Sequence, residues 1–149
     1  MKKDINITSL PPGRYWIGDL CYVMHDRWQE FCSMLFPAGR EDSLKGSFLF
    51  DGHRGWQHRT AYGDGKYSGN GNIPGLILPR SFGVDSGLIG IIPEGLVGHS
   101  SEDKPENGLY ISVNSEVICR YCEGEFLFIC AEGVLVIDTG LEDADANFD

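Results

Sequence analysis

The sequence lacks several features that would assign it to a familiar class of protein. No apolar run approaches the roughly 20 residues of a membrane-spanning helix. The two lysines near the N-terminus are not followed by the apolar core of a secretory signal, so we expect a cytosolic protein. Positive charge is also scarce, with 12 Lys and Arg against 22 Asp and Glu, a net charge of −10. So acidic a chain is unsuited to non-specific binding of nucleic acid or of anionic membranes.

Common catalytic motifs are missing as well. There is no GxSxG nucleophile elbow, no GxxxxGK[ST] phosphate loop and no HExxH zinc motif. The four histidines, at positions 25, 53, 58 and 99, follow no metal-ligand spacing, and we interpret each as a solvated or hydrogen-bonded surface residue. A catalytic role remains the alternative for them. The sequence thus indicates no cofactor.

The cysteine pattern points to reduced thiols rather than to disulfides or zinc. Five cysteines, an odd number, occur in a chain without an export signal. Cys119 and Cys122 form a CxxC motif, but it lies within a strand-like segment, where residues three apart point to opposite faces. We therefore predict no metal site there.

The local patterns predict a mostly β fold of the α+β kind. Twenty glycines punctuate short β-branched and aromatic runs, which is typical of many strands joined by tight turns. One helix is expected near residues 26–36, capped by Asp26, because Trp28, Phe31, Cys32 and Leu35 follow helical spacing. The expected architecture is an antiparallel sheet or sandwich with this single helix packed on it.

The strand predictions are clearest at the C-terminal end. Residues 109–140 read as a β-meander, with hairpin turns at Glu123-Gly124 and Glu132-Gly133. Strands are also predicted at 46–52 and 56–62, with a hairpin signal at Asp64-Gly65 and a loop at 68–75. Residues 1–13 read as a leader that pairs late or not at all. We expect one β-rich domain over residues 1–141 and a disordered acidic tail over 142–149.

The most informative residues are three aspartates, Asp19, Asp64 and Asp85. Each lies within two residues of a glycine at an expected strand end, so the three can gather at one rim of a sheet. Clustered carboxylates can bind a divalent cation or polarise a water molecule. The alternative is that each aspartate satisfies backbone N–H groups in its own tight turn.

Three segments carry a resemblance to a known family. The residues PPGRYWIGDLCYV (11–23), TAYGDGKY (60–67) and GVDSGLIGIIP (83–93) resemble a family of small uncharacterised bacterial and phage proteins with GRY, GDGxY and VD(S/A)G segments. The resemblance covers roughly residues 11–93. It implies an all-β or α+β fold and a bacterial or viral setting, hence a bacterial cytoplasm, but no activity.

The leading expectation for function is therefore a non-catalytic binding protein. If it is phage-encoded, it would act on a host protein or on a small nucleotide-like host signal. Aromatic residues near strand rims suit either ligand, and we expect the binding residues to be Asp19, Trp56, Tyr62, Asp64, Tyr67 and Asp85. Trp16 and Tyr110 are further aromatics predicted to lie near loops. The alternative function is a metal-assisted hydrolase that uses Asp64 and Asp85 with His58.

Overall fold

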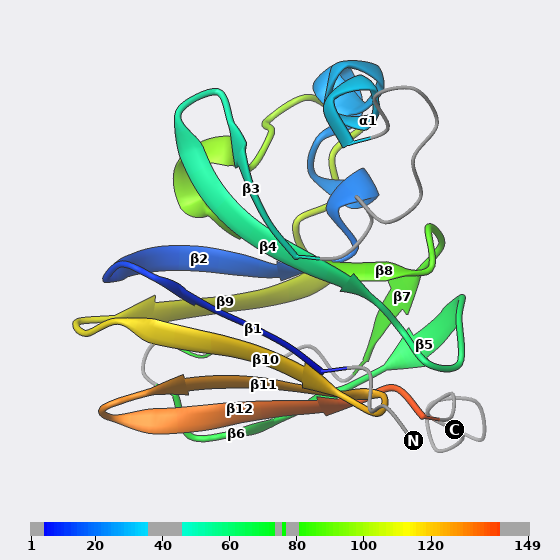
Figure 1. Cartoon of the computed structure of the whole chain (residues 1–149). Coiled ribbons are helices and arrows are strands. Elements are labelled where there is room, and N and C mark those ends of the chain that lie inside the picture. The colour runs from blue at the N-terminus through cyan, green and yellow to red at the C-terminus, as the bar shows by residue number, and fades with distance from the viewer. Residues whose placement is uncertain (1–4, 36–45, 74–75, 77–80, 141–149) are drawn as a thin grey trace.

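The computed structural model describes residues 5–35, 46–73, 76 and 81–140 (Figure 1). The strands are β1 (Ile5–Leu10), β2 (Gly13–Gly18), β3 (Gly46–Phe50), β4 (His53–Arg59), β5 (Gly65–Tyr67), β6 (Gly69–Gly71), β7 (Phe82–Val84), β8 (Leu88–Pro93), β9 (Gly108–Val113), β10 (Val117–Cys122), β11 (Glu125–Cys130) and β12 (Gly133–Asp138). The α-helix is α1 (Trp28–Leu35), and short 3-10 turns span Leu20–Tyr22, His25–Arg27 and Glu94–Leu96. No helix in the described ranges is long and apolar enough to cross a membrane.

The strands form two five-stranded sheets and one small one. Sheet A has the order β1-β10-β11-β12-β6, and sheet B has the order β3-β4-β8-β2-β9. Among the described residues, β5 and β7 pair only with each other, and every strand pairing is antiparallel. The mostly β fold with antiparallel sheets and one helix is the fold that the sequence predicted.

The main core lies between the two sheets, which face each other (Figure 1). Strand β10 shows why, because Val117, Cys119 and Tyr121 point inward and are buried while the residues between them are more exposed. Cys119 and Cys122 therefore lie on opposite faces of sheet A, as their spacing predicted. The buried side chains of both sheets meet here, among them Ile17, Trp56, Ile91, Ile111, Phe126, Phe128, Leu135 and Ile137.

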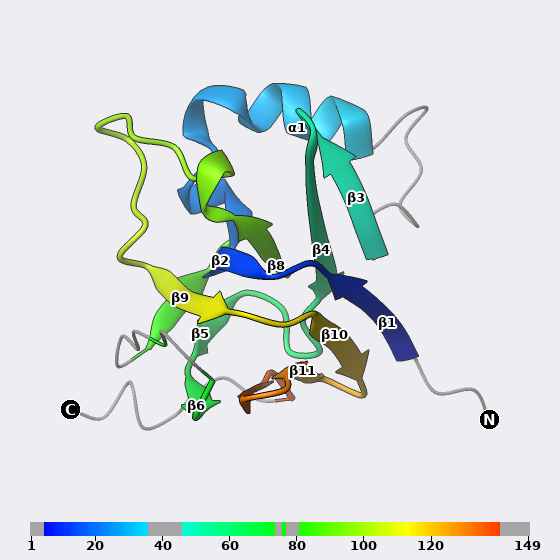
Figure 2. The same ribbon diagram turned by 90° about the vertical axis from the view of Figure 1, so that its left-hand side faces the viewer.

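A second, smaller core covers the other face of sheet B. There α1 packs over β3 and the start of β4, on the side away from sheet A (Figure 2). Phe31 of the helix is fully buried and makes edge-on ring contacts with Phe48 and Phe50 of β3. Trp16 and Ile92 contribute from the sheet. The molecule is thus layered as sheet, sheet and helix.

The helix begins differently from the prediction. Its first turn is the 3-10 turn His25–Arg27, so Asp26 lies inside the helical segment rather than before it. The preceding residue, Met24, makes no side-chain capping hydrogen bond. Burial of Phe31 rather than a cap at Asp26 stabilises this helix, since an amphipathic face gains most of its stability from packing.

The N-terminal segment is also a correction. Residues 5–10 form an edge strand, β1, which pairs with β10 along its whole length. Leu10 is buried in the main core, and Asn6 accepts a hydrogen bond of 2.7 Å from the indole of Trp56. The alternation of INITSL is that of a half-buried strand, which Pro11 and Pro12 obscure in the sequence.

Of the two hairpin turns predicted in the C-terminal meander, Glu123-Gly124 is confirmed and Glu132-Gly133 is not, and Asp51-Gly52, predicted as the end of a strand, forms a further hairpin turn. Asp51-Gly52 and Glu123-Gly124 both have positive φ at both positions, the backbone of a two-residue type I′ turn. The third hairpin turns at Ala131-Glu132, because Cys130 pairs with Gly133 across it. Gly133 is therefore the first residue of β12, not part of the turn.

The middle of the chain pairs differently from the prediction. The segment around Asp64-Gly65 does not fold β5 back on β4. Instead β5 pairs with β7, and the predicted loop at 68–75 contains β6, which pairs with β12. A Cβ atom added to Gly71 would lie 2.0 Å from the carbonyl oxygen of Val134. Glycine is therefore needed here because β6 and β12 approach each other closely, and not because the chain turns.

Candidate functional site

The candidate site is built around the buried side chain of Asp19, which follows the end of β2. Asp19 is fully buried, and its Oδ1 accepts a hydrogen bond of 3.1 Å from the backbone N–H of Cys21. This bond caps the 3-10 turn Leu20–Tyr22. Part of the prediction that aspartates serve their own turns is therefore correct for Asp19.

The other bonds of Asp19 reach a distant segment. Its Oδ2 accepts hydrogen bonds of 2.7 Å each from the backbone N–H groups of Asp85 and Ser86, and its Oδ1 accepts one of 2.8 Å from the Ser86 hydroxyl. Burying a carboxyl group is costly unless its oxygens are satisfied in this way. The interior of the protein thus holds the loop after β7 in one backbone conformation.

That loop borders a pocket of about 500 Å³, lined by Tyr22, Asp64, Gly65, Lys66, Gly83, Val84, Asp85 and Asn107. Within sheet register, Gly65 lies opposite Val84, so the next residues along, Asp64 and Asp85, face each other across the end of the β5–β7 pair. Both carboxylates are exposed to solvent. The pocket is therefore an open, acidic hollow at one end of the small sheet.

Two further side chains fix the walls of this pocket. The Tyr22 hydroxyl donates a hydrogen bond to Oδ2 of Asp85. The Asn107 side-chain oxygen accepts one of 2.8 Å from the backbone N–H of Gly83 in β7. Asp85 is consequently positioned both through its backbone, by Asp19, and through its side chain, by Tyr22.

Burial and the nearby carboxyl groups raise the pKa values of two side chains at the site, Cys21 and Tyr22. Burial, together with the nearby charges of Asp19, Asp85 and Asp64, raises the pKa of the Cys21 thiol well above its ordinary value. Burial and the hydrogen bond to Asp85 likewise raise the pKa of Tyr22. Neither group is therefore an activated nucleophile at neutral pH, because the thiolate or phenolate would form beside carboxylates.

The structure brings the three predicted aspartates together. Asp64 and Asp85 line one pocket, and Asp19 holds the backbone of Asp85 from beneath. Within the described residues, the Asp64 carboxylate accepts no hydrogen bond from its own turn. The clustered arrangement, not the purely local one, describes Asp64 and Asp85.

The predicted aromatic residues are placed less favourably for binding. Trp56 and Tyr67 are fully buried in the main core, and Trp16 is fully buried in the smaller one, so none offers its ring to a partner. Tyr62 is half exposed but does not line the pocket. Tyr110 is partly buried on the outer face of sheet B, where the guanidinium of Arg14 lies over its ring.

His58 also departs from its predicted place on the surface. It is 1% exposed, and its ring stacks on Tyr121 with centroids 3.6 Å apart, inside the main core. It does not line the pocket with Asp64 and Asp85. The three residues of the predicted hydrolase site are therefore not assembled. Across the ranges that the structure describes, no group of three or more His, Cys, Asp or Glu residues is arranged to hold a metal ion.

Sequence reasoning missed Tyr22, Lys66 and Asn107 as lining residues. Tyr22 and Lys66 lie within three residues of the predicted aspartates, so the GDLCY and GDGKY segments were a usable signal. Asn107 lies in the polar loop before β9 and has no such signal. Its role depends on a contact with Gly83, which only the folded chain brings near.

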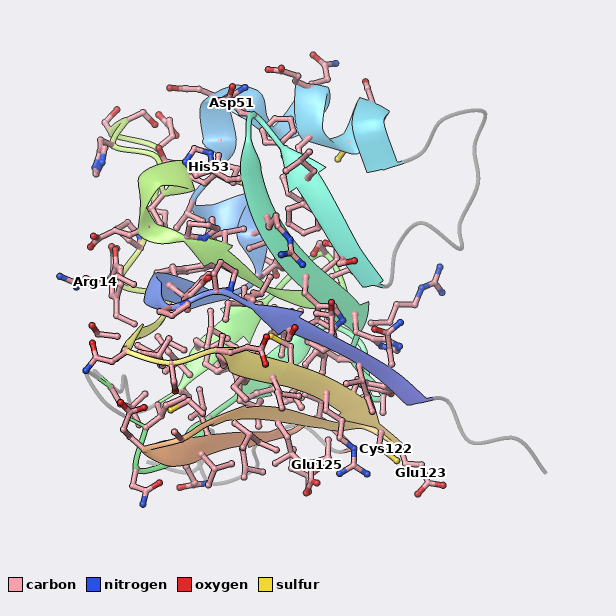
Figure 3. All side chains as sticks on the ribbon, turned by 60° about the vertical axis from the view of Figure 1, so that its left-hand side comes forward. Arg14, Asp51, His53, Cys122, Glu123 and Glu125 are labelled. Atoms are coloured by element: carbon pink, nitrogen blue, oxygen red, sulfur yellow. The ribbon has the colours of Figure 1, made fainter. Side chains whose placement is uncertain are left out.

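A second hollow, of about 480 Å³, lies between the starts of β2 and β4 and the 3-10 turn after β8. Its basic side chains include Arg14 and His53, which Figure 3 shows on this side of the molecule. Each already has an internal partner. Arg14 forms an ion pair with Glu94 at 3.4 Å, and Nδ1 of His53 lies 2.9 Å from the carbonyl oxygen of Asp51. We therefore take the acidic pocket as the candidate site.

Comparisons of this chain with protein-family models, with curated proteins and with solved structures found no match.

Proposed function

We propose that the protein is a non-catalytic binding protein and that the acidic pocket beside Asp85 holds a cationic group of a protein partner. One observation carries this proposal. The fully buried carboxyl group of Asp19 accepts hydrogen bonds from the backbone N–H groups of Asp85 and Ser86, and it thereby fixes the position of the exposed residue Asp85. A rigid surface carboxylate loses less conformational entropy on binding than a mobile one. Asp64, opposite Asp85, doubles the negative charge at the same place.

The chemistry of the lining favours an arginine or lysine side chain as the ligand. A guanidinium group carries five N–H donors in a planar fork and bonds well to carboxylates. A phosphate-bearing ligand meets two carboxylates here and, among the lining residues that the structure describes, only Lys66 as a compensating cation. We accordingly favour a protein over the nucleotide-like ligand, and the resemblance to phage proteins makes a host protein in the bacterial cytoplasm the partner we propose.

The same lining argues for binding without turnover. Among the groups near the pocket that carry nucleophilic atoms, the pKa values of Cys21 and Tyr22 are raised, and the Ser86 hydroxyl donates a hydrogen bond to the Asp19 carboxyl group. His58, the base of the alternative hydrolase mechanism, is stacked in the core. A pocket with acceptors but no activated nucleophile suits recognition of a donor-rich group.

The test compares binding by three forms of the full-length protein. Immobilised wild type, Asp85→Asn and Asp26→Asn are exposed to a bacterial lysate, and retained proteins are identified by mass spectrometry. Asp26 is an exposed aspartate outside the pocket, so Asp26→Asn removes the same charge without changing the proposed binding site. We expect partners that are retained by wild type and Asp26→Asn but lost with Asp85→Asn.

A direct titration then identifies the ligand chemistry. Amide chemical shifts of residues 64–66 and 83–85 are followed as a blocked arginine, its neutral analogue blocked citrulline, or a purine nucleotide is added. Shifts with arginine alone, abolished in Asp85→Asn, support the proposal. Shifts with the nucleotide alone, or equal shifts with arginine and citrulline, would contradict it.

A further inference from the structure

The outer face of sheet A carries aliphatic side chains where a solvent-facing sheet usually carries polar ones. In the register of the sheet, one row runs Ser9, Ile118, Ile129, Val134, and the next runs Ile7, Arg120, Leu127, Val136, Asn70. Six of these nine residues are aliphatic, and we call Ile7, Ile118, Leu127, Ile129, Val134 and Val136 the apolar face. Ile7 is 61% exposed and Ile118 is 39% exposed.

This face has no cover in the part of the chain that the structure describes. Helix α1 lies on the far side of sheet B, and the outer side of β10–β12 is clear of other described elements (Figures 1 and 2). An antiparallel sheet with one buried face normally alternates apolar and polar residues, with the polar ones outward. Here β11 and β12 are apolar on both faces except at Glu125 and Asp138, at one end of the strands, and such a pattern is that of strands covered on both sides.

We propose that the apolar face of sheet A is a self-association surface, on which a second copy of this chain packs face to face. This proposal is independent of the acidic pocket. Two copies related by a two-fold axis present the same patch to each other, so the patch must be complementary to itself. Short aliphatic side chains of similar size can interdigitate with their own kind, as the inner faces of sheets A and B do within the main core.

The charges on this face are also self-complementary. Arg120 lies in the middle row, and Glu125 and Asp138 lie opposite each other in the adjoining row. Figure 3 shows Glu125 and Cys122 at that end of the β10–β11 hairpin. One patch therefore carries both a cation and the anions that can pair with it across a two-fold axis. In the described residues Arg120 has no ion-pair partner within its own chain.

The size of the face fits a weak dimer. Four strands spaced about 4.8 Å apart and six residues long, at about 3.3 Å per residue, cover roughly 400 Å² in projection. Stable interfaces bury about 800 Å² of accessible surface per partner, and weak, transient ones less than about 600 Å². We therefore expect a dimer that forms with increasing concentration. Because each chain carries a net charge of −10, salt should strengthen it by screening repulsion.

The experiment measures the oligomeric state of the full-length protein by sedimentation velocity over a range of concentrations. It is run at about 0.01 M and about 0.15 M ionic strength, between which the Debye length falls from about 30 Å to about 8 Å. We expect a monomer–dimer equilibrium that shifts toward dimer at the higher ionic strength. Salt should have the opposite effect on a cation in the acidic pocket, so the two proposals can fail separately.

Matched variants locate the interface. Ile118→Lys places a charge in the apolar face, and Leu49→Lys makes the same kind of change at a 63% exposed site on β3, a strand of sheet B that is not part of the apolar face. The proposal is supported if Ile118→Lys no longer forms the dimer and Leu49→Lys still does. If Ile118→Lys does not fold, as judged by circular dichroism, the milder Ile118→Thr replaces it, with Leu49→Thr as its control.

Three outcomes overturn the proposal. The first is a wild-type monomer at every concentration and both ionic strengths. The second is a dimer that Ile118→Lys and Leu49→Lys affect equally, which places the interface elsewhere. The third is a monomeric wild type whose variant ending at Gly140 dimerises, which makes residues 141–149 of the same chain the occupant of the face.

Discussion

The carboxyl group of Asp19 holds the backbone of Asp85 through a hydrogen bond of 2.7 Å, joining the end of one strand to the loop after another. Asp19 is fully buried, whereas Asp85 is exposed. The same oxygen also accepts from the N–H of Ser86. An interior side chain thereby determines where a surface carboxylate lies, and the acidic pocket depends on this contact.

Replacing Asp19 with asparagine should destabilise the fold and disorder the pocket. Both oxygens of Asp19 accept hydrogen bonds, four in all, from N–H and O–H donors. In asparagine an amide nitrogen, itself a donor, replaces one of these oxygens and would face donors that it cannot accept from. Losing hydrogen bonds to a buried carboxyl group costs about 1.5–3 kcal/mol. Urea unfolding measures the loss, with exposed Asp26→Asn as the control, expected within about 0.5 kcal/mol of wild type. Equal stability of the two variants would show that Asp19 is not structural.

Asp64→Asn and Asp85→Asn should behave in the opposite way to Asp19→Asn. Both side chains are exposed, and asparagine keeps an oxygen that can accept from Tyr22 in the case of Asp85. Removing one of two facing carboxylates also relieves repulsion, so each variant should be as stable as wild type or slightly more stable. Urea unfolding measures this, and a loss above about 1 kcal/mol in either variant contradicts it.

The sequence predicted what is local in this structure and missed what is not. The C-terminal meander and the Glu123-Gly124 turn follow from alternation and turn chemistry within a few residues. The pairing of β5 with β7 and of β6 with β12 joins segments that are far apart, and no local pattern distinguishes those partners from others.

The same distinction applies to the site. Gathering the three aspartates was predictable, because each lies at one end of a strand within two residues of a glycine, and strand ends can share a rim of the sheet. The burial of His58 was not predictable, because it depends on stacking against Tyr121 from the other sheet. Trp16 and Trp56 were likewise assigned to the surface from nearby loop residues, while the packing of two opposed sheets buries them.

The ring of Trp16 is accommodated by two glycines, and this predicts a sharp cost for adding a methyl group. Gly18 and Gly108 are opposite each other on β2 and β9. A Cβ on Gly108 would lie 2.1 Å from Cζ2 of Trp16 and 2.8 Å from the carbonyl oxygen of Ile17, neither of which can move freely. We expect Gly108→Ala to lose about 1–3 kcal/mol or more.

Gly83→Ala is the control for this prediction. The nearest atom to a Cβ on Gly83 is the Tyr22 hydroxyl oxygen at 3.4 Å, an ordinary contact. Thermal unfolding of both variants gives the comparison. A melting temperature for Gly108→Ala as high as that of Gly83→Ala would mean that Trp16 can move aside.

Glu123 lies in a conformation that asparagine adopts more readily. It is the first turn residue of the β10–β11 hairpin, with a φ of 50°, and it is followed by Gly124. Asn-Gly is a preferred pair for this type I′ turn. Glu123→Asn should therefore raise the free energy of unfolding by up to about 1 kcal/mol.

The matched control for this substitution is Glu132→Asn in the next hairpin. Positive φ is not found at Glu132, so asparagine offers no conformational advantage there. Urea unfolding of the two variants should show a gain for the first and none for the second, or a small loss there because Glu132→Asn removes the hydrogen bond of 3.2 Å from the Ser115 hydroxyl. A gain in both would point to reduced negative charge rather than to turn geometry.

The last prediction is that stability falls at alkaline pH. Burial raises the pKa of Cys119 above its ordinary value of 9.0. Burial, with a smaller contribution from Cys119, raises the pKa of Tyr15 from 10.0 to about 12. In the folded protein both groups therefore keep their protons to a higher pH than in the unfolded chain.

The sign follows from proton binding. Between the unfolded and folded pKa values the folded state binds more protons, so the free energy of unfolding decreases as pH rises. The stabilisation is complete below about pH 9 and is lost progressively from there through about pH 12. Urea unfolding in reducing buffer at about pH 8 and about pH 10.5 measures the decrease, since these values bracket the ordinary cysteine and tyrosine pKa values.

Cys119→Val isolates the part due to the buried thiol. Valine suits an inward position on a strand and has no proton to lose, so the variant should lose less stability than wild type between the two pH values. Tyr15→Phe should reduce the decrease too, although it also removes the hydrogen bond of 2.5 Å from the Tyr15 hydroxyl to the carbonyl oxygen of Pro11. If both variants lose as much stability as wild type, groups elsewhere in the chain govern its alkaline unfolding.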